Sequence, residues 1–397
     1  MEYIIIDPID HIRSLSIGLV INFGASLESK GKEGLAHFLE HLIFRIKDKE
    51  GNYISRIVEE NGGIFNGYTT YEYILIYARI PYYSFYKVIE AFKFMIDKFD
   101  ITIDELETEK GVVIEEIRSS LDDPEEVIFE RYNRLRYEGT GFSHSILGNE
   151  DTIKNITLES ILKDRNLIFK KYPRFISISG YFKENFLSYL SPLVNEIEYQ
   201  YNKVDVKKLR SFKKIDNSDK FNQSHFVLGF DFNYNDIMKD HYSVLFFNAI
   251  MLDTLSSRLF KKLRDDKGLV YVIYPSIEFY KEFGSYSIYF STSKEKYKEV
   301  LDIIEREIYD IIKKGFSKSE INFAKNYLKG QIIMSDESPS RRMINIFKHQ
   351  LFYNKILSID ERINFIENFD IDYLNYFIQT TFKDFSLYGL IGEAKNG

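Results

Sequence analysis

Two histidines spaced four residues apart, His37 and His41, with Glu40 between them, are the residues of this chain best suited to chemistry. They lie in the segment LAHFLEHLIF, residues 35–44, whose other members are almost all apolar. In a helix, four residues make a little over one turn, so both imidazoles and Glu40 leave the same face. Burying these polar groups without partners would be costly, and one metal ion could satisfy them together.

The same pattern could instead be a structural helix whose histidines are satisfied by hydrogen bonds. A chance HxxEH string is expected on the order of once in a hundred chains with this histidine content, so the motif is fairly specific. HxxEH is the zinc motif of the inverzincins, in which two histidines bind the metal and the glutamate acts as general base on the metal-bound water. We therefore expect about one Zn²⁺ per chain, bound by His37 and His41, with Glu40 as the base.

A third metal ligand is expected in the helical pattern of residues 101–121, ITIDELETEKGVVIEEIRSSL. At about 100° per residue, its apolar residues define one buried face. Glu109 and Glu116, seven residues apart, lie along one edge of that face, whereas Glu115 points roughly opposite to it. We expect Glu116 to bind the metal and Glu109 to orient a histidine from behind. For each acid taken alone, a solvated helix face is the alternative.

The length of 397 residues exceeds what one hydrophobic core usually holds, so two domains are expected. Residues 199–222 are polar and rich in lysine without clean periodicity, which favours a linker between domains at 1–198 and 223–397. The second half repeats the first in outline: DELETEK at 104–110 has a counterpart, SEINFAK, at 319–325. In that second copy Ala324 stands where Glu109 stood, so only the first domain is expected to hold the metal.

Composition excludes several classes of protein. The apolar runs are too short or too interrupted to span a bilayer, so no membrane partner is expected. The net charge of −7, without a concentrated basic stripe, makes nucleic acid an unexpected partner. The amino terminus does not resemble a secretory signal, and the chain has no cysteine; both features favour a cytoplasmic protein.

These residues resemble the pitrilysin family of zinc peptidases, in the two-domain form of bacterial processing-peptidase-like proteins. HFLEH, followed by 74 residues and then Glu116, is similar to the family's motif and its distant glutamate, and Glu109 matches its second acid. The segments NGGIFNGYTTYE, SHSILG and SSRLFKKLRDDKGLVY also resemble family elements. The chain departs from the family pattern after Phe44 and at Gly67, two differences that bear on substrate preference.

The resemblance implies an α+β fold of two related domains, each a mainly antiparallel sheet packed with helices, which dimerises into a clamp-like chamber. It implies that Arg264 and Tyr271 hold the substrate backbone and the developing oxyanion; from the residues alone they would be a solvated charge and a strand aromatic. It also implies a substrate-binding strand made of Asn66, Gly67, Tyr68 and Thr69.

The leading functional hypothesis is a zinc-dependent endopeptidase that hydrolyses extended, unstructured peptides inside a dimeric chamber. The partner would be an identical chain or a related subunit. A non-catalytic assembly or binding subunit is the alternative from another class, and the intact HxxEH argues against it. A protease dedicated to one leader-bearing peptide differs from the leading hypothesis in its substrate only.

Overall fold

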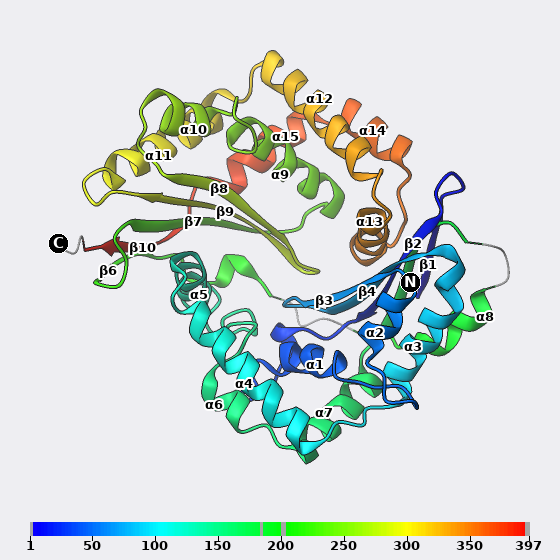
Figure 1. Ribbon diagram of the computed structural model, residues 1–397. Helices are drawn as coiled ribbons and strands as arrows, with labels where there is room; N and C mark the ends of the chain where they lie inside the picture. The colour runs from blue at the N-terminus through cyan, green and yellow to red at the C-terminus, as the bar shows by residue number, and fades with distance from the viewer. Residues whose placement is uncertain (1–2, 183–185, 200–203, 394–397) are drawn as a thin grey trace. The chain divides into compact units, whose positions relative to one another are not determined.

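A computed structural model describes residues 3–182, 186–199 and 204–393. The chain forms two compact units, each assembled from several segments. The first unit contains Met1–Ser120, Gly139–Gln200 and Ser335–Leu357, and the second contains Leu121–Glu138, Tyr201–Met334 and Ser358–Gly397. Each unit has one five-stranded sheet, and helices pack on both of its faces (Figure 1).

The sheet of the first unit runs in the order β1-β5-β2-β4-β3. β1 pairs with β5 in parallel, and every other pair is antiparallel, which confirms the predicted mainly antiparallel sheet. β3 therefore forms one edge of this sheet. The strands are β1 (Ile4–Pro8), β2 (Ser14–Ile21), β3 (Ile64–Thr69), β4 (Ile74–Pro81) and β5 (Arg174–Gly180).

The two helices expected in the first unit, at residues 35–44 and 101–121, are both present. The long helix begins with a capping box, since Glu105 N donates to Thr102 Oγ1 at 3.2 Å and Thr102 N donates to Glu105 Oε2 at 2.9 Å. The helices are α1 (Leu35–Ile43), α2 (Ile54–Glu60), α3 (Phe85–Asp97), α4 (Ile103–Ser120), α6 (Glu150–Lys154), α7 (Leu158–Lys171), α8 (Leu187–Leu190) and α13 (Pro339–Tyr353).

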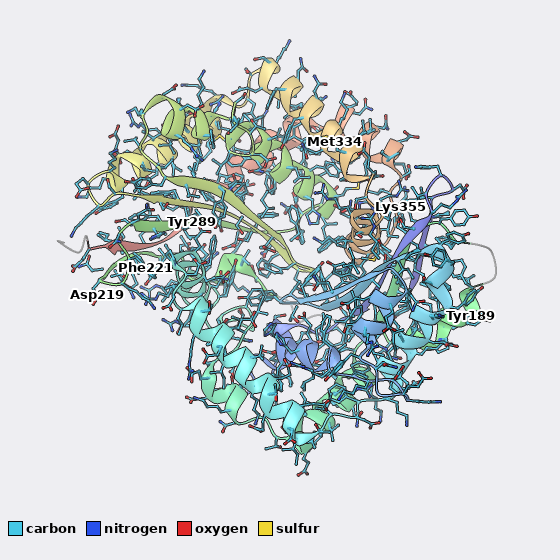
Figure 2. The ribbon with its side chains drawn as sticks, in the orientation of Figure 1. Tyr189, Asp219, Phe221, Tyr289, Met334 and Lys355 are labelled. Atoms are coloured by element: carbon cyan, nitrogen blue, oxygen red, sulfur yellow. The ribbon has the colours of Figure 1, made fainter. Side chains whose placement is uncertain are left out.

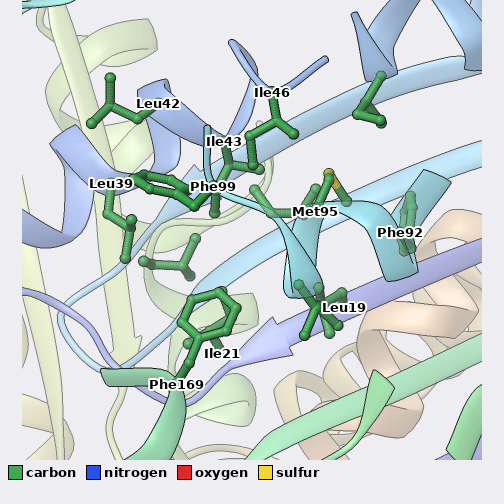
Figure 3. Close-up of a cluster of buried hydrophobic side chains, with 14 of the residues drawn as sticks. Leu19, Ile21, Leu39, Leu42, Ile43, Ile46, Phe92, Met95, Phe99 and Phe169 are labelled. Atoms are coloured by element: carbon green, nitrogen blue, oxygen red, sulfur yellow. The ribbon is translucent and has the colours of Figure 1, made fainter. Parts of the chain in front are cut away.

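The core of the first unit follows from the alternation of side chains along β2. Leu19 and Ile21 point to the face covered by α1 and α3, where Leu39 and Phe92 pack in the same cluster (Figure 3). The opposite face meets α13. There Gly18 leaves room for the helix, because a Cβ at this position would lie 3.0 Å from Met343 Sδ.

The second unit repeats this architecture. Its sheet order, β6-β10-β7-β9-β8, is the order of the first sheet with every strand number raised by five, and β6 and β10 are again the parallel pair. The strands are β6 (Lys213–Ser218), β7 (Ser224–Asn233), β8 (Val272–Phe279), β9 (Phe283–Thr292) and β10 (Ser386–Gly392). The helices are α5 (Pro124–Arg136), α9 (Ile237–Met251), α10 (Arg258–Phe260), α11 (Tyr297–Lys314), α12 (Lys318–Ser335), α14 (Ile359–Glu367) and α15 (Ile371–Thr381).

Helix α5 covers the second sheet as α13 covers the first. Its Tyr132 packs in a cluster with Phe221 and Tyr289, the last two of which are labelled in Figure 2. Gly229 of β7 is the counterpart of Gly18, since a Cβ there would lie 1.9 Å from the Tyr132 hydroxyl. Each half of the sequence thus donates one helix to the sheet built by the other half.

The predicted division at 1–198, 199–222 and 223–397 does not include this exchange of helices, and it places one strand of the second sheet in the linker. The expected linker contains β6, which pairs with β10, so it is part of the second sheet. Residues 200–203 of that linker lie outside the described residues. The difference has a physical reason: each sheet needs apolar cover on both faces, and the sequence near a helix does not reveal which sheet it covers.

None of the helices in the described part of the chain is both long and apolar enough to cross a membrane.

Candidate metal site

Helix α1 forms as the apolar pattern predicts and buries nearly all of its residues. His37 and Glu40 are both 8% exposed, and His41 is the more accessible imidazole. The two histidine rings lie on one face of the helix, with their centroids 4.6 Å apart. Two imidazoles therefore present Nε2 atoms in one direction from a rigid, buried element.

Glu116 on α4 faces these two rings. Its Oε2 lies 3.8 Å from His37 Nε2 and 3.5 Å from His41 Nε2. The ligand atoms of the three residues all lie within 4.8 Å of one another. Glu115 instead turns away and pairs with Arg118 at 2.6 Å. The structure thus brings together the three residues that the spacing indicated.

The donor set fits a zinc ion. Zinc bound at about 2.1 Å in a tetrahedron places neighbouring ligand atoms about 3.4 Å apart, close to the separations between the two Nε2 atoms and Glu116 Oε2. The side chain of Glu116 is 45% exposed, so the group opens on one side to solvent. A catalytic zinc site needs such an open position for water or substrate. His37 Nδ1 is buried and has no hydrogen-bond partner within the described residues.

Glu109 lies behind His41, about two turns before Glu116 on α4. His41 Nδ1 donates to Glu109 Oε2 at 3.1 Å, which fixes the ring so that Nε2 points towards Glu116. Arg45 Nε donates to the other oxygen of the same carboxylate. A buried carboxylate thus joins an imidazole to a guanidinium, an arrangement that holds a metal-binding histidine in place.

The two imidazoles have opposite pKa shifts. Burial and the nearby His41 lower the pKa of His37 to about 4, against the raising effect of Glu116. Burial would also lower the pKa of His41, but its hydrogen bonds to Glu109 and Glu116 outweigh burial and raise it to about 9. The bond with His41 also holds the pKa of Glu116 below its usual value. The site therefore concentrates negative charge around one imidazole, as a cation requires.

Glu40 lies beside these three residues, and its carboxylate accepts a hydrogen bond from β3, the strand expected to bind substrate. Thr69 Oγ1, at the end of β3, donates to Glu40 Oε2 at 2.6 Å. Burial raises the pKa of Glu40, against the lowering effect of the Thr69 hydrogen bond. A carboxylate with a raised pKa and a fixed orientation is suited to accept and return a proton.

A cavity of about 460 Å³ lies next to the site within the first unit. Asn66 of β3 lines it together with Glu40 and His41, so the edge strand and the acid share one opening. Gly67 fits closely against the helix side of the strand, because a Cβ there would lie 3.2 Å from the Phe44 ring. The other lining residues are Phe44, Arg45, Tyr53, Ser55, Glu109 and Val112.

Arg264 and Tyr271 belong to the second unit. Arg264 is exposed on the segment Lys261–Asp266, which is wound as a π-helix, and it stacks over the Phe260 ring at 5.2 Å. Tyr271 precedes β8 and is 58% exposed. Their predicted role in holding substrate rests on the resemblance alone.

Two contacts of the site were not predicted from the sequence. Arg45, which holds Glu109, and Thr69, which holds Glu40, make their bonds across 64 and 29 residues. Arg45 follows His41 by four residues, about one helical turn, so its place on the same face could have been a signal. Thr69 had been assigned to substrate instead.

Curated relatives match almost the whole chain, and two family models match most of it. Residues 6–150 match the model described as insulinase (peptidase family M16), and residues 181–328 match the peptidase M16 inactive domain. An uncharacterized zinc protease of Bacillus subtilis, YmxG, is 26% identical over 392 residues, covering 97% of this chain and 94% of that protein. An uncharacterized zinc protease of Rickettsia felis is 25% identical and covers 95% of this chain and 91% of that protein.

Solved structures share the fold at low identity. A protease from Helicobacter pylori superimposes with a TM-score of 0.85 at 19% identity, over 97% of this chain and 96% of that one. A peptidase M16 inactive domain from Pseudomonas fluorescens gives a TM-score of 0.85 at 15% identity, over 98% and 96%. The expected pitrilysin-type fold and family are thereby confirmed: this chain belongs to the M16 (insulinase) family of peptidases.

Proposed function

We propose that the chain is a zinc-dependent endopeptidase. The observation that carries this proposal is the convergence of His37, His41 and Glu116 on one point, with Glu40 beside them. The names of the curated relatives support zinc and proteolysis. When bound, zinc supplies a Lewis acid that polarises the peptide carbonyl and makes water a better nucleophile.

The chain's own residues perform the proton transfers and hold the geometry. Glu40 accepts a proton from the attacking water and later returns it to the leaving amine. Thr69 keeps the Glu40 carboxylate turned towards the ligand group through its 2.6 Å hydrogen bond. Glu109, held by Arg45, keeps the ring of His41 in the metal-binding orientation.

Peptide substrates bind in an extended form along the free edge of β3, from Asn66 to Thr69. Among the described strands β3 pairs only with β4, so its other edge can accept a further strand. Main-chain pairing of this kind accepts many sequences. The cavity beside Asn66 then receives one substrate side chain next to the bond that is cut. Unstructured peptides are cut, whereas folded proteins resist.

The complete enzyme is a dimer in which Arg264 and Tyr271 contribute to substrate binding and oxyanion stabilisation. Most closed oligomers of this size are two-fold symmetric, and such symmetry would supply these residues from the partner chain. A cytoplasmic location is part of the proposal and rests on the absence of cysteine.

A non-catalytic subunit is the second candidate, favoured by the match of residues 181–328 to a domain described as inactive. That match covers the half of the sequence in which Ala324 stands in place of Glu109. The ligand group lies in the other half, so the match does not reach it.

Mass spectrometry of the purified chain incubated with a mixed peptide library tests the proposal. Zinc-dependent cleavage that chelator stops and Glu40→Gln removes is the expected result, and the fragments report bond preference and size limit. Wild-type protein that carries zinc yet cuts no peptide would establish the non-catalytic alternative. Rapid cleavage of a stable, loop-free folded domain would contradict binding along the β3 edge.

A further inference from the structure

The amino-terminal end of α1 is capped by a side chain from outside the helix, six residues before the N-cap position. Its own N-cap position, Gly34, has no side chain and adopts a φ of +92°. Glu28 takes over the role: Gly34 N donates to its Oε2 at 2.9 Å, and Ala36 N donates to its Oε1 at 2.6 Å. A carboxylate at this place satisfies free N–H groups and complements the positive end of the helix dipole.

The Glu28 carboxylate is completely buried and has a second partner. His144 Nε2 lies 3.0 Å from Glu28 Oε2, and the exposed fraction of the Glu28 side chain is 0%. The His144 carbonyl in turn accepts a hydrogen bond from the Tyr71 hydroxyl at 3.1 Å. His144 and Glu28 are 116 residues apart in the sequence, so their contact joins two distant segments.

The loop that carries His144, residues 139–149, lies backbone to backbone against the segment before α1. A Cβ at Gly148 would come within 2.2 Å of the Glu33 carbonyl, and a Cβ at Gly141 within 1.9 Å of the Ser26 carbonyl. Side chains at these positions would push the two segments apart. The loop and the start of α1 are therefore packed as one piece.

The same loop continues into α6, which contacts α4, the helix that carries Glu116. It ends in α6, where Glu150 pairs with Arg118 of α4 at 2.9 Å, two residues beyond Glu116. Lys110 of α4 also donates to the Lys154 carbonyl at 3.3 Å. One continuous segment, residues 139–154, thus contacts the start of the histidine helix and the body of the glutamate helix.

We propose that Glu28 and His144 are positioning residues that set the place of His37 and His41 relative to Glu116. Ala36, which Glu28 holds, directly precedes His37, so a shift of the helix start moves both imidazoles against α4. This inference rests on the proposed zinc site. In this role Glu28 and His144 contact neither metal nor substrate; they hold the metal-binding residues in place.

The test uses Co²⁺ as a probe, because its visible absorption reports ligand geometry without turnover. His144→Leu and Glu28→Gln should weaken Co²⁺ binding by about tenfold, the effect typical of residues that hold metal ligands in place, and should change the absorption bands. His144→Gln keeps an N–H at about the same reach and should restore both affinity and spectrum. Thr157→Ala removes the N-cap of α7 in the same unit and is the control for simple loss of a cap.

Variants at His144 and Glu28 that match Thr157→Ala in Co²⁺ affinity and spectrum would overturn the inference and leave the proposed function standing. Failure of His144→Gln to rescue would also overturn it. If Glu28→Gln does not fold, the His144 pair decides alone. Wild-type protein that binds no metal would overturn the proposed function together with this inference.

Discussion

Helices α1 and α9 occupy the same place in the two units, since each follows the central strand of its sheet. Both bury a histidine and a carboxylate, which in α9 are His241 and Asp240. In α9 these groups are satisfied by hydrogen bonds: the Tyr373 hydroxyl donates to Asp240 Oδ1 at 2.7 Å, and His241 Nε2 lies 3.1 Å from the Tyr234 hydroxyl. The second unit thus realises the purely structural alternative considered for the first.

The long helices differ in the same way. On α4, Glu109 and Glu116 face the histidine pair. On α12, Ala324 is fully buried in the apolar core where Glu109 would stand. The comparison teaches that a buried histidine and an acid do not by themselves make a metal site. What distinguishes the first unit is that donors from two helices converge on one point and share an open side.

The largest expected effect separates the acids of α1 and α9. Glu40→Gln should lower peptide hydrolysis by about 10³-fold or more while zinc content is unchanged, because the variant loses only the proton acceptor. Asp240→Asn, which changes the buried acid of α9, should lower the melting temperature and leave the activity per folded molecule unchanged. Zinc analysis, peptide assays and thermal melts of both variants check this. An active Glu40→Gln enzyme would remove Glu40 from the mechanism.

The next effect concerns the two neighbouring acids of α4. Glu116→Gln should weaken zinc binding by about 10²-fold, since a ligand is replaced by a neutral amide, whereas Glu115→Gln should bind like the wild type. Competition with a chromophoric chelator measures both. The reverse ranking would mean that α4 presents its other face to the histidines.

A smaller effect is expected for Arg45, which contacts Glu109 and none of the three proposed ligands. Arg45→Met should weaken zinc binding by about tenfold, because Glu109 then loses the guanidinium that fixes it behind His41. Lys47→Met removes a 2.7 Å ion pair to Glu105, which lies on α4 like Glu109 but away from the site. This control variant should leave zinc binding unchanged. Equal losses in the two variants would show that only the general attachment of α4 matters.

The smallest expected effect is a partial recovery of activity, which tests whether Tyr271 of the second unit acts on the site of a partner chain. Glu40→Gln and Tyr271→Phe homodimers should each be weak, but mixing them should restore about a quarter of wild-type activity if half of the dimers are mixed and one of their two sites is complete. Size-exclusion chromatography of tagged chains must first show that subunits exchange. Activity no higher than that of the parents would place Tyr271 in the same chain as the site it serves, or outside catalysis.

The local part of this structure was predictable from the sequence. The helix around HxxEH, the capping box at Thr102, and the place of Glu116 relative to Glu115 all follow from periodicity within one helix. The repeated sheet was visible as a weak duplication. Each of these features depends on residues only a few positions apart, or on a pattern that occurs twice.

The rest depended on contacts between distant segments. The Glu28 carboxylate accepts from Ala36 N, eight residues away, and pairs with His144, 116 residues away; neither residue carries a local signal for this. The Thr69 bond to Glu40 is set by the register of β3 on β4, which the strand sequence alone does not fix. The exchange of α5 and α13 was missed because a helix sequence shows an apolar face but not the sheet that it covers.

The exchange of helices also determines when the first unit can finish folding during synthesis. The first unit needs α13, whose Met343 carbonyl accepts the Ser177 hydroxyl hydrogen bond at 2.6 Å, and this helix ends at Tyr353 of a 397-residue chain. The histidine helix leaves the ribosome long before α13, so its sheet remains uncovered on one face while the intervening residues are made. A nascent fragment that carries HxxEH but lacks Pro339–Tyr353 is therefore an unfinished fold, and the histidine pair acquires its final surroundings only after that helix has been made.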